Sequence, residues 1–222
     1  MSNQQRPRPG KLSERVVEQG FPQHVFGYAL EDDLVLYYGF TEIVFLYLTG
    51  ELPTSEKAKA FDTAMMLQSP ISVREAPAHA AMLARLMGSH LANVTGIGSV
   101  ALTEWARSVT EQHQEFLEWL NKPNKVLPAC AYSDSSDSRQ YREMLVARLA
   151  KENISIATLE RSLSAEAARL AVFHWAGLVL PDQMLAALVV ARLPCAIAQA
   201  LSHLPSELMN YPANMPEFQY ER

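Results

Sequence analysis

The chain has 222 residues, of which 49% are hydrophobic and 19% charged, and its formal net charge is −5. This length and apolar content predict one domain of moderate size, or one with a small appended subdomain, and a substantial core. The acidic balance excludes nucleic acid as the expected main partner, because no basic stripe is present to neutralise phosphates.

The N-terminal stretch has no apolar signal region, and no apolar run reaches the length of a membrane helix. The two cysteines, Cys130 and Cys195, have neither metal-binding nor redox spacing. We therefore expect a soluble, cytoplasmic protein with reduced thiols and no contact with a membrane.

Residues 1–11 are polar and contain two prolines and a glycine, which predicts a disordered arm. Leu12 to Glu18 could form one short helix, and Phe26-Gly27-Tyr28 reads as an extended lead into the next. Phe40 to Thr49 is almost continuously apolar and predicts a helix buried on most of its faces. Gly50 suits the left-handed position that ends a helix.

A second helix is expected over residues 56–67, and a third from Pro77 to about Ser89, since proline is favoured in a first turn. Residues 93–102 hold two glycines in an apolar setting. Such glycines allow either close packing of helices or a backbone approach to a ligand, and composition favours the packing. The helical pattern resumes through Trp105 and continues to Leu120.

Residues 121–138 are rich in proline, serine and aspartate and predict a loop. A charged helix over 139–151 and a weak one over 156–163 follow. Ser164 is a good N-cap for a helix to about Ala176. Pro181 should start another helix, which Pro194 interrupts before a last helical segment and an irregular tail. Because no strand exceeds a few residues, the expected class is all-α.

Two blocks resemble the citrate synthase and citryl-CoA lyase family. The first is Gly27-Tyr28, a short helix, and then Phe-x-Glu-x-x-x-Leu-x-Leu-x-Gly-Glu-Leu-Pro-Thr over residues 40–54; the second spans Leu163 to His203. The resemblance implies a multi-helical citrate synthase-like fold in a short, divergent form. Its large helical domain would comprise residues 12–108 plus 164–222, and residues 109–163 would form a reduced small domain.

In this family, an enol formed from the acetyl group of a CoA thioester attacks the ketone of an oxo acid. The chemistry requires a carboxylate base, two histidines and arginines that hold the substrate carboxylates. The resemblance puts Trp105 at the position of the first histidine and Cys130 at that of the second. We interpret Trp105 as a core residue and Cys130 as a small loop residue.

Three charged residues match the rest of the family site. Glu166 corresponds to the catalytic acid, although the helix dipole alone explains an acid in a first turn. Arg139 and Arg192 correspond to the carboxylate clamp, and Arg192 has a structural alternative as the ion-pair partner of Glu166. Met215 replaces a third clamp arginine. None of the histidines has metal-ligand spacing, so neither a metal nor a cofactor is expected.

The leading hypothesis is a degenerate family member that binds a di- or tricarboxylate weakly or serves as a non-catalytic subunit. The alternative is an active acyl-CoA synthase or lyase, with a citrate-type product, rebuilt around the three charged residues. A purely structural or interaction protein is the third class. We expect a homodimer, or a heterodimer with a family relative, through the small-residue faces of Ala80 to Met87 and Ile97 to Leu102.

Overall fold

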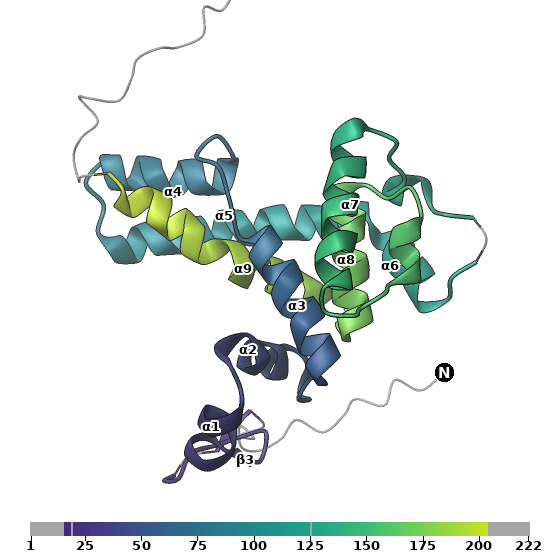
Figure 1. The fold of residues 1–222 in the computed structure, drawn as a ribbon. Helices are drawn as coiled ribbons and strands as arrows, with labels where there is room; N and C mark the ends of the chain where they lie inside the picture. Colours follow the sequence, from purple (N-terminus) through teal and green to yellow (C-terminus); the bar gives the residue numbers. More distant parts are fainter. Residues whose placement is uncertain (1–15, 19, 125, 204–222) are drawn as a thin grey trace, which may run out of the picture.

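In a computed structural model of the protein, residues 16–18, 20–124 and 126–203 are described. The arm expected over residues 1–11, the irregular tail and the position of Met215 lie outside these residues. The described residues are mainly helical (Figure 1), which confirms the all-α class.

A small antiparallel sheet opens the described chain. It contains β1 (Val17–Glu18), β2 (His24–Val25) and β3 (Tyr28–Ala29), in the order β1-β2-β3. Phe26 and Gly27 both have positive φ, which suits the two-residue turn that joins β2 to β3. The helix expected over 12–18 is therefore wrong where the structure describes it, since Val17 pairs with Val25 across the sheet.

Two short helical segments link this sheet to the first long apolar helix. They are η1 (Leu30–Leu34), a single π-helical turn, and α1 (Val35–Tyr37). Helix α2 (Phe40–Thr49) then ends at Gly50, whose φ of 79° is left-handed as predicted. However, α2 is not buried on most faces: among its residues only Val44, Phe45 and Leu46 are buried, because it packs on the rest of the chain along one side.

Three helices gather at one end of the molecule: α4 (Ala76–Leu86), α5 (Leu91–Gln112) and α9 (Pro181–Leu201). Figure 1 shows them side by side, and α5 extends from them toward the helices at the other end of the molecule, where it contacts α6. A Cβ added to Gly98 would lie 3.4 Å from the Cβ of Ala81 on α4. This glycine therefore serves close helix packing, as its composition indicated.

The other end contains α6 (Gln114–Asn121), α7 (Ser136–Ala150) and α8 (Ala165–Ala176), with the 3₁₀ turns η2 (Ala129–Ala131) and η3 (Ala157–Glu160). The weak helix expected over 156–163 is replaced by the 3₁₀ turn η3 alone. The N-cap of α8 is Ser164, as predicted, and its hydroxyl accepts a hydrogen bond from the backbone N–H of Ala167 at 3.1 Å.

Helix α3 (Ser55–Gln68) runs between the two groups and packs against α2, α7, α8 and α9. Its Phe61 lies against Phe45 of α2 and Phe173 of α8, with ring centroids 5.3 and 5.8 Å away. Helix α8 contacts α6 and α7 as well as α3 and α9. It therefore joins the predicted large and small domains, and the exact boundary between them stays a prediction.

Helix α9 corrects two expectations. Pro194 does not interrupt it: the proline lies on the exposed side, where water can satisfy the backbone carbonyl that loses its donor. As a result, α9 is 21 residues long with a mean hydropathy of 1.9, and by length and composition it could cross a membrane. In this fold α9 packs on α4 and α5 and carries the buried Arg192, which is how the core helix of a globular domain behaves.

Candidate functional site

The three charged residues singled out from the sequence come from α7, α8 and α9, and the structure unites only two of them. Glu166 lies in the first turn of α8, which Ser164 caps. Its carboxylate pairs with Arg169 one turn later, at 2.8 Å, and its side chain is 46% exposed. The i,i+3 spacing on a helix places these two side chains next to each other, so Glu166 already has a cationic partner.

Arg192 is the most constrained of the three, at 8% exposure. Its Nε donates to the backbone oxygen of Gln68 at 3.2 Å, and one terminal nitrogen donates to Glu75 at 2.7 Å. The guanidinium also lies 4.2 Å from the ring centroid of Trp105, a cation–π contact. The sequence correctly indicated an ion pair, but the partner is Glu75, which precedes α4, and not Glu166.

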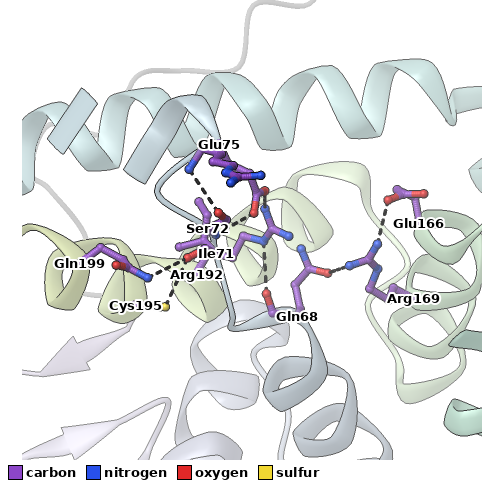
Figure 2. Close-up of polar contacts among 10 residues, drawn as sticks. Gln68, Ile71, Ser72, Glu75, Glu166, Arg169, Arg192, Cys195 and Gln199 are labelled. Carbon is purple, nitrogen blue, oxygen red and sulfur yellow. Dashed lines mark hydrogen bonds and ion pairs between the residues drawn. The ribbon is translucent and has the colours of Figure 1, made fainter. Parts of the chain in front are cut away.

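Arg169 and Gln68 connect the two ion pairs. One terminal nitrogen of Arg169 donates to the side-chain oxygen of Gln68, and the guanidinium lies 5.1 Å from the ring centroid of Tyr141. Figure 2 shows Gln68 between the two arginines, so that hydrogen bonds run continuously from one end of the cluster to the other. We call this set the arginine–glutamate network; its members are Glu75, Arg192, Gln68, Arg169 and Glu166.

Sequence reasoning missed Glu75, Gln68 and Arg169. The spacing of Glu166 and Arg169 was a visible signal of a helical ion pair. No such signal existed for Glu75 and Arg192, because 117 positions separate them in sequence. Their contact depends on α9 packing beside the turn between α3 and α4.

The network has no unused guanidinium and almost no free space. Two arginines face two glutamates, so the formal charges cancel. The void among Gln68, Trp105, Glu166 and Arg169 measures about 10 Å³, roughly the space of one water molecule. In this arrangement neither a tricarboxylate nor a CoA thioester can enter between the arginines.

Tyr141 closes the network from the side of α7. Burial raises the pKa of its hydroxyl, although the nearby charge of Arg169 opposes the shift. The hydroxyl oxygen is buried and has no hydrogen-bond partner in the structure. An unsatisfied buried hydroxyl costs free energy, which makes Tyr141 a useful position for testing the network.

Arg139 lies outside the network. It is in the first part of α7, is exposed, and forms an ion pair with Asp134 at 3.1 Å. The small void is not lined by it. Arg139 therefore does not share a cavity with Arg192 and Glu166, because it is directed toward Asp134 in the loop before α7, while the other two belong to the network around Gln68.

Two residues correspond to the family histidines, Trp105 in α5 and Cys130 in η2, and they lie in different parts of the structure. Trp105 is half-buried, packs against the core as predicted, and covers Arg192. Cys130 is half-buried in η2 and borders an open groove together with glutamates of α5 and α6. The two positions thus do not face one cavity in this structure. Among the described residues, no group of three or more His, Cys, Asp or Glu side chains could hold a metal ion.

A larger cavity lies elsewhere, between the start of α2 and α3. It is an open groove of about 610 Å³. Its polar walls include Thr41, Glu42, Lys59 and Asp62, and no member of the arginine–glutamate network borders it. No sequence pattern predicts this groove, since its two walls come together only when α2 packs on α3.

Comparison with known proteins supports the fold and leaves the chemistry open. The structure of citryl-CoA lyase from Hydrogenobacter thermophilus is similar to this one, with a TM-score of 0.64 over 95% of this chain and 94% of that chain, at 15% sequence identity. No protein-family model and no curated protein sequence matches the chain. A likeness at this identity shows a citrate synthase-like fold, as the sequence resemblance implied, while function must be argued from the residues.

Proposed function

We propose that this chain is a catalytically degenerate relative of the citrate synthase and citryl-CoA lyase enzymes, and that it acts as a non-catalytic subunit. The observation that carries the proposal is the closed arginine–glutamate network. Each arginine that could clamp a substrate carboxylate already binds a carboxylate of the chain itself, around a void of about 10 Å³.

The residues at the two histidine-like positions support the same conclusion. A thiol is only a weak hydrogen-bond donor to a developing oxyanion, and the indole N–H of a tryptophan can donate but has no second ring nitrogen to accept or carry a proton as an imidazole does. Loss of one such donor typically costs about a hundred- to a thousand-fold in rate. Trp105 also stacks on Arg192, which keeps that guanidinium away from any substrate.

An activity assay and a binding assay test the proposal together. We expect no CoA thiol release from acetyl-CoA with oxaloacetate and no cleavage of citryl-CoA. We also expect no heat of binding from oxaloacetate or citrate at millimolar concentration. Turnover near one per second, within the usual range of enzymes, would instead support the active alternative rebuilt around Glu166 and the arginines.

A non-catalytic subunit needs a partner, and we propose a homodimer or a heterodimer with a relative of the same fold. Within the two small-residue faces suggested by the sequence, Met87, Ile97 and Val100 are exposed, while Ala81 and Leu102 are buried inside the chain. These exposed side chains on α4 and α5 would supply the contact. Copurification with a second protein of this fold, or light scattering above the 24.8 kDa of one chain, would support it; a monomer at all concentrations would contradict it.

A further inference from the structure

A second exposed apolar surface lies far from α4 and α5, at the start of α2. Val35, Leu36, Tyr37 and Phe40 are consecutive or nearly so, and all four are largely exposed, Tyr37 at 75% and Phe40 at 79%. We call these four residues the N-terminal knob. Figure 1 shows α1 and the small sheet extending from α2, away from the groups of helices formed by α4–α9.

The knob adjoins the open groove between α2 and α3. The segment from Tyr38 to Glu42 lines the groove on one side and α3 lines it on the other, through Ser55, Ala58, Lys59 and Asp62. Tyr38 and Gly39, which border the groove, directly follow Tyr37 of the knob, and Thr41 directly follows Phe40. The knob and the groove therefore adjoin each other where α2 begins.

The charges in the groove are already paired within the chain. Lys59 binds Glu152 at 3.0 Å, Asp62 accepts a hydrogen bond from Thr41 at 2.9 Å, and Glu42 accepts one from the backbone N–H of Gly39 at 2.8 Å. Such a groove suits a neutral aromatic ring better than a phosphate. Its carboxylate oxygens also retain lone pairs that could accept a hydrogen bond from a tyrosine hydroxyl.

We propose that the knob of one copy binds in the groove of a second copy of this chain, and the second knob in the first groove. A two-fold interface uses the same patch on both partners, so it requires a knob and a hole next to each other, as here. An anionic lipid surface fits less well, because the exposed Glu31, Asp32 and Asp33 are separated from the knob in sequence only by Leu34. This contact is separate from the subunit role proposed above and does not depend on it.

The size of the patch sets the expected affinity. At their observed exposures, Tyr37 and Phe40 together offer on the order of 300 Å². A stable interface takes about 800 Å² from each partner, so Val35, Leu36 and the groove walls would have to supply the remainder. We therefore expect a reversible association at tens of micromolar, at the weak end of specific interfaces.

Sedimentation velocity of the full chain, over about 1–200 μM, tests this association. Phe40→Glu places a charge on the knob, and Ala58→Trp fills the groove while leaving the knob intact. Each should weaken the association at least roughly tenfold, the equivalent of about 1.4 kcal/mol. The matched control is Val126→Glu, because Val126 is also 75% exposed but lies in the loop after α6; this variant should associate like the wild type. Circular dichroism checks folding, and Tyr37→Ser replaces any knob variant that does not fold.

Mixing the two variants gives the sharpest outcome. A copy with Phe40→Glu keeps its groove and a copy with Ala58→Trp keeps its knob, so one of the two reciprocal contacts can re-form. The mixture should associate more strongly than either variant alone and less strongly than the wild type. The proposal is overturned if the wild type shows no association that these variants weaken, or if the mixture behaves like the separate variants. The activity and binding assays that test the subunit proposal do not depend on the knob or the groove, so the two proposals can fail independently.

Discussion

Replacement of Arg192 by alanine tests whether the arginine–glutamate network is a structural element or the remainder of a ligand site. In the folded chain this guanidinium is almost completely buried and contacts Gln68, Glu75 and Trp105. If these contacts are structural, the variant is less stable than the wild type, and neither protein binds citrate. If the site is a carboxylate clamp, the variant should instead lose affinity for citrate.

The expected loss of stability follows from the three contacts. The Gln68 carbonyl would lose its donor in a buried place, at a cost of about 1–3 kcal/mol. The cation–π contact with Trp105 contributes about 0.5–2 kcal/mol. The Glu75 side chain is 40% exposed, so water can solvate the carboxylate left behind and this ion pair adds about 1 kcal/mol at most. Together the three contributions predict a loss of about 1.5–6 kcal/mol, or a fall in Tm of roughly 3–24 °C for a domain of this size.

Urea unfolding followed by circular dichroism measures this change, with calorimetric titration of citrate on the same samples. Arg139→Ala is the matched control, because it also removes an arginine from an ion pair, but an exposed one with Asp134. We expect it to cost less than about 1 kcal/mol. The reasoning would be refuted if Arg192→Ala were as stable as Arg139→Ala, or if the wild type bound citrate at millimolar concentration and the Arg192 variant did not.

Three further predictions concern single positions. Tyr141→Phe should leave the free energy of unfolding unchanged or raise it, since the buried hydroxyl has no partner to lose; a loss above about 1 kcal/mol in urea unfolding would show that the hydroxyl is bonded after all. Burial lowers the pKa of His174 below its usual value of 6.5, so its contribution to stability is present above about pH 6.5 and is lost as pH falls through the lower, folded-state pKa. Unfolding curves should be measured between pH 5 and pH 8, about one unit or more on each side of the ordinary histidine pKa. The free energy of unfolding should fall toward low pH in the wild type and fall less in His174→Gln. Gly50→Ala should cost about 1–2 kcal/mol, because φ is 79° there, and thermal melts that match the wild type would contradict a left-handed requirement.

The sequence by itself determined the local features that depend on neighbouring residues. Gly50 and Ser164 end and begin helices through their own backbone freedom and side-chain hydroxyl, which need no distant partner. The order and spacing of residues 40–54 also pointed to a citrate synthase-like fold, and the solved structure of similar shape confirms it. The burial of Arg192 was predictable in the same way, since an arginine within an apolar helix requires a partner.

Only the tertiary structure decided which residue is the partner of Arg192, and therefore whether Arg192 remains available to bind a substrate carboxylate. Glu75 and Gln68 reach Arg192 because α9 packs beside the turn after α3, and no local pattern encodes a contact between residues more than a hundred positions apart. For the same reason Arg139 could not be excluded from the site until α7 was placed. Phe40, the knob residue that lies in α2, gives the converse case. The apolar run from Phe40 to Thr49 predicted burial, but a side chain is buried only where another surface packs against it, and within the described chain none covers Phe40.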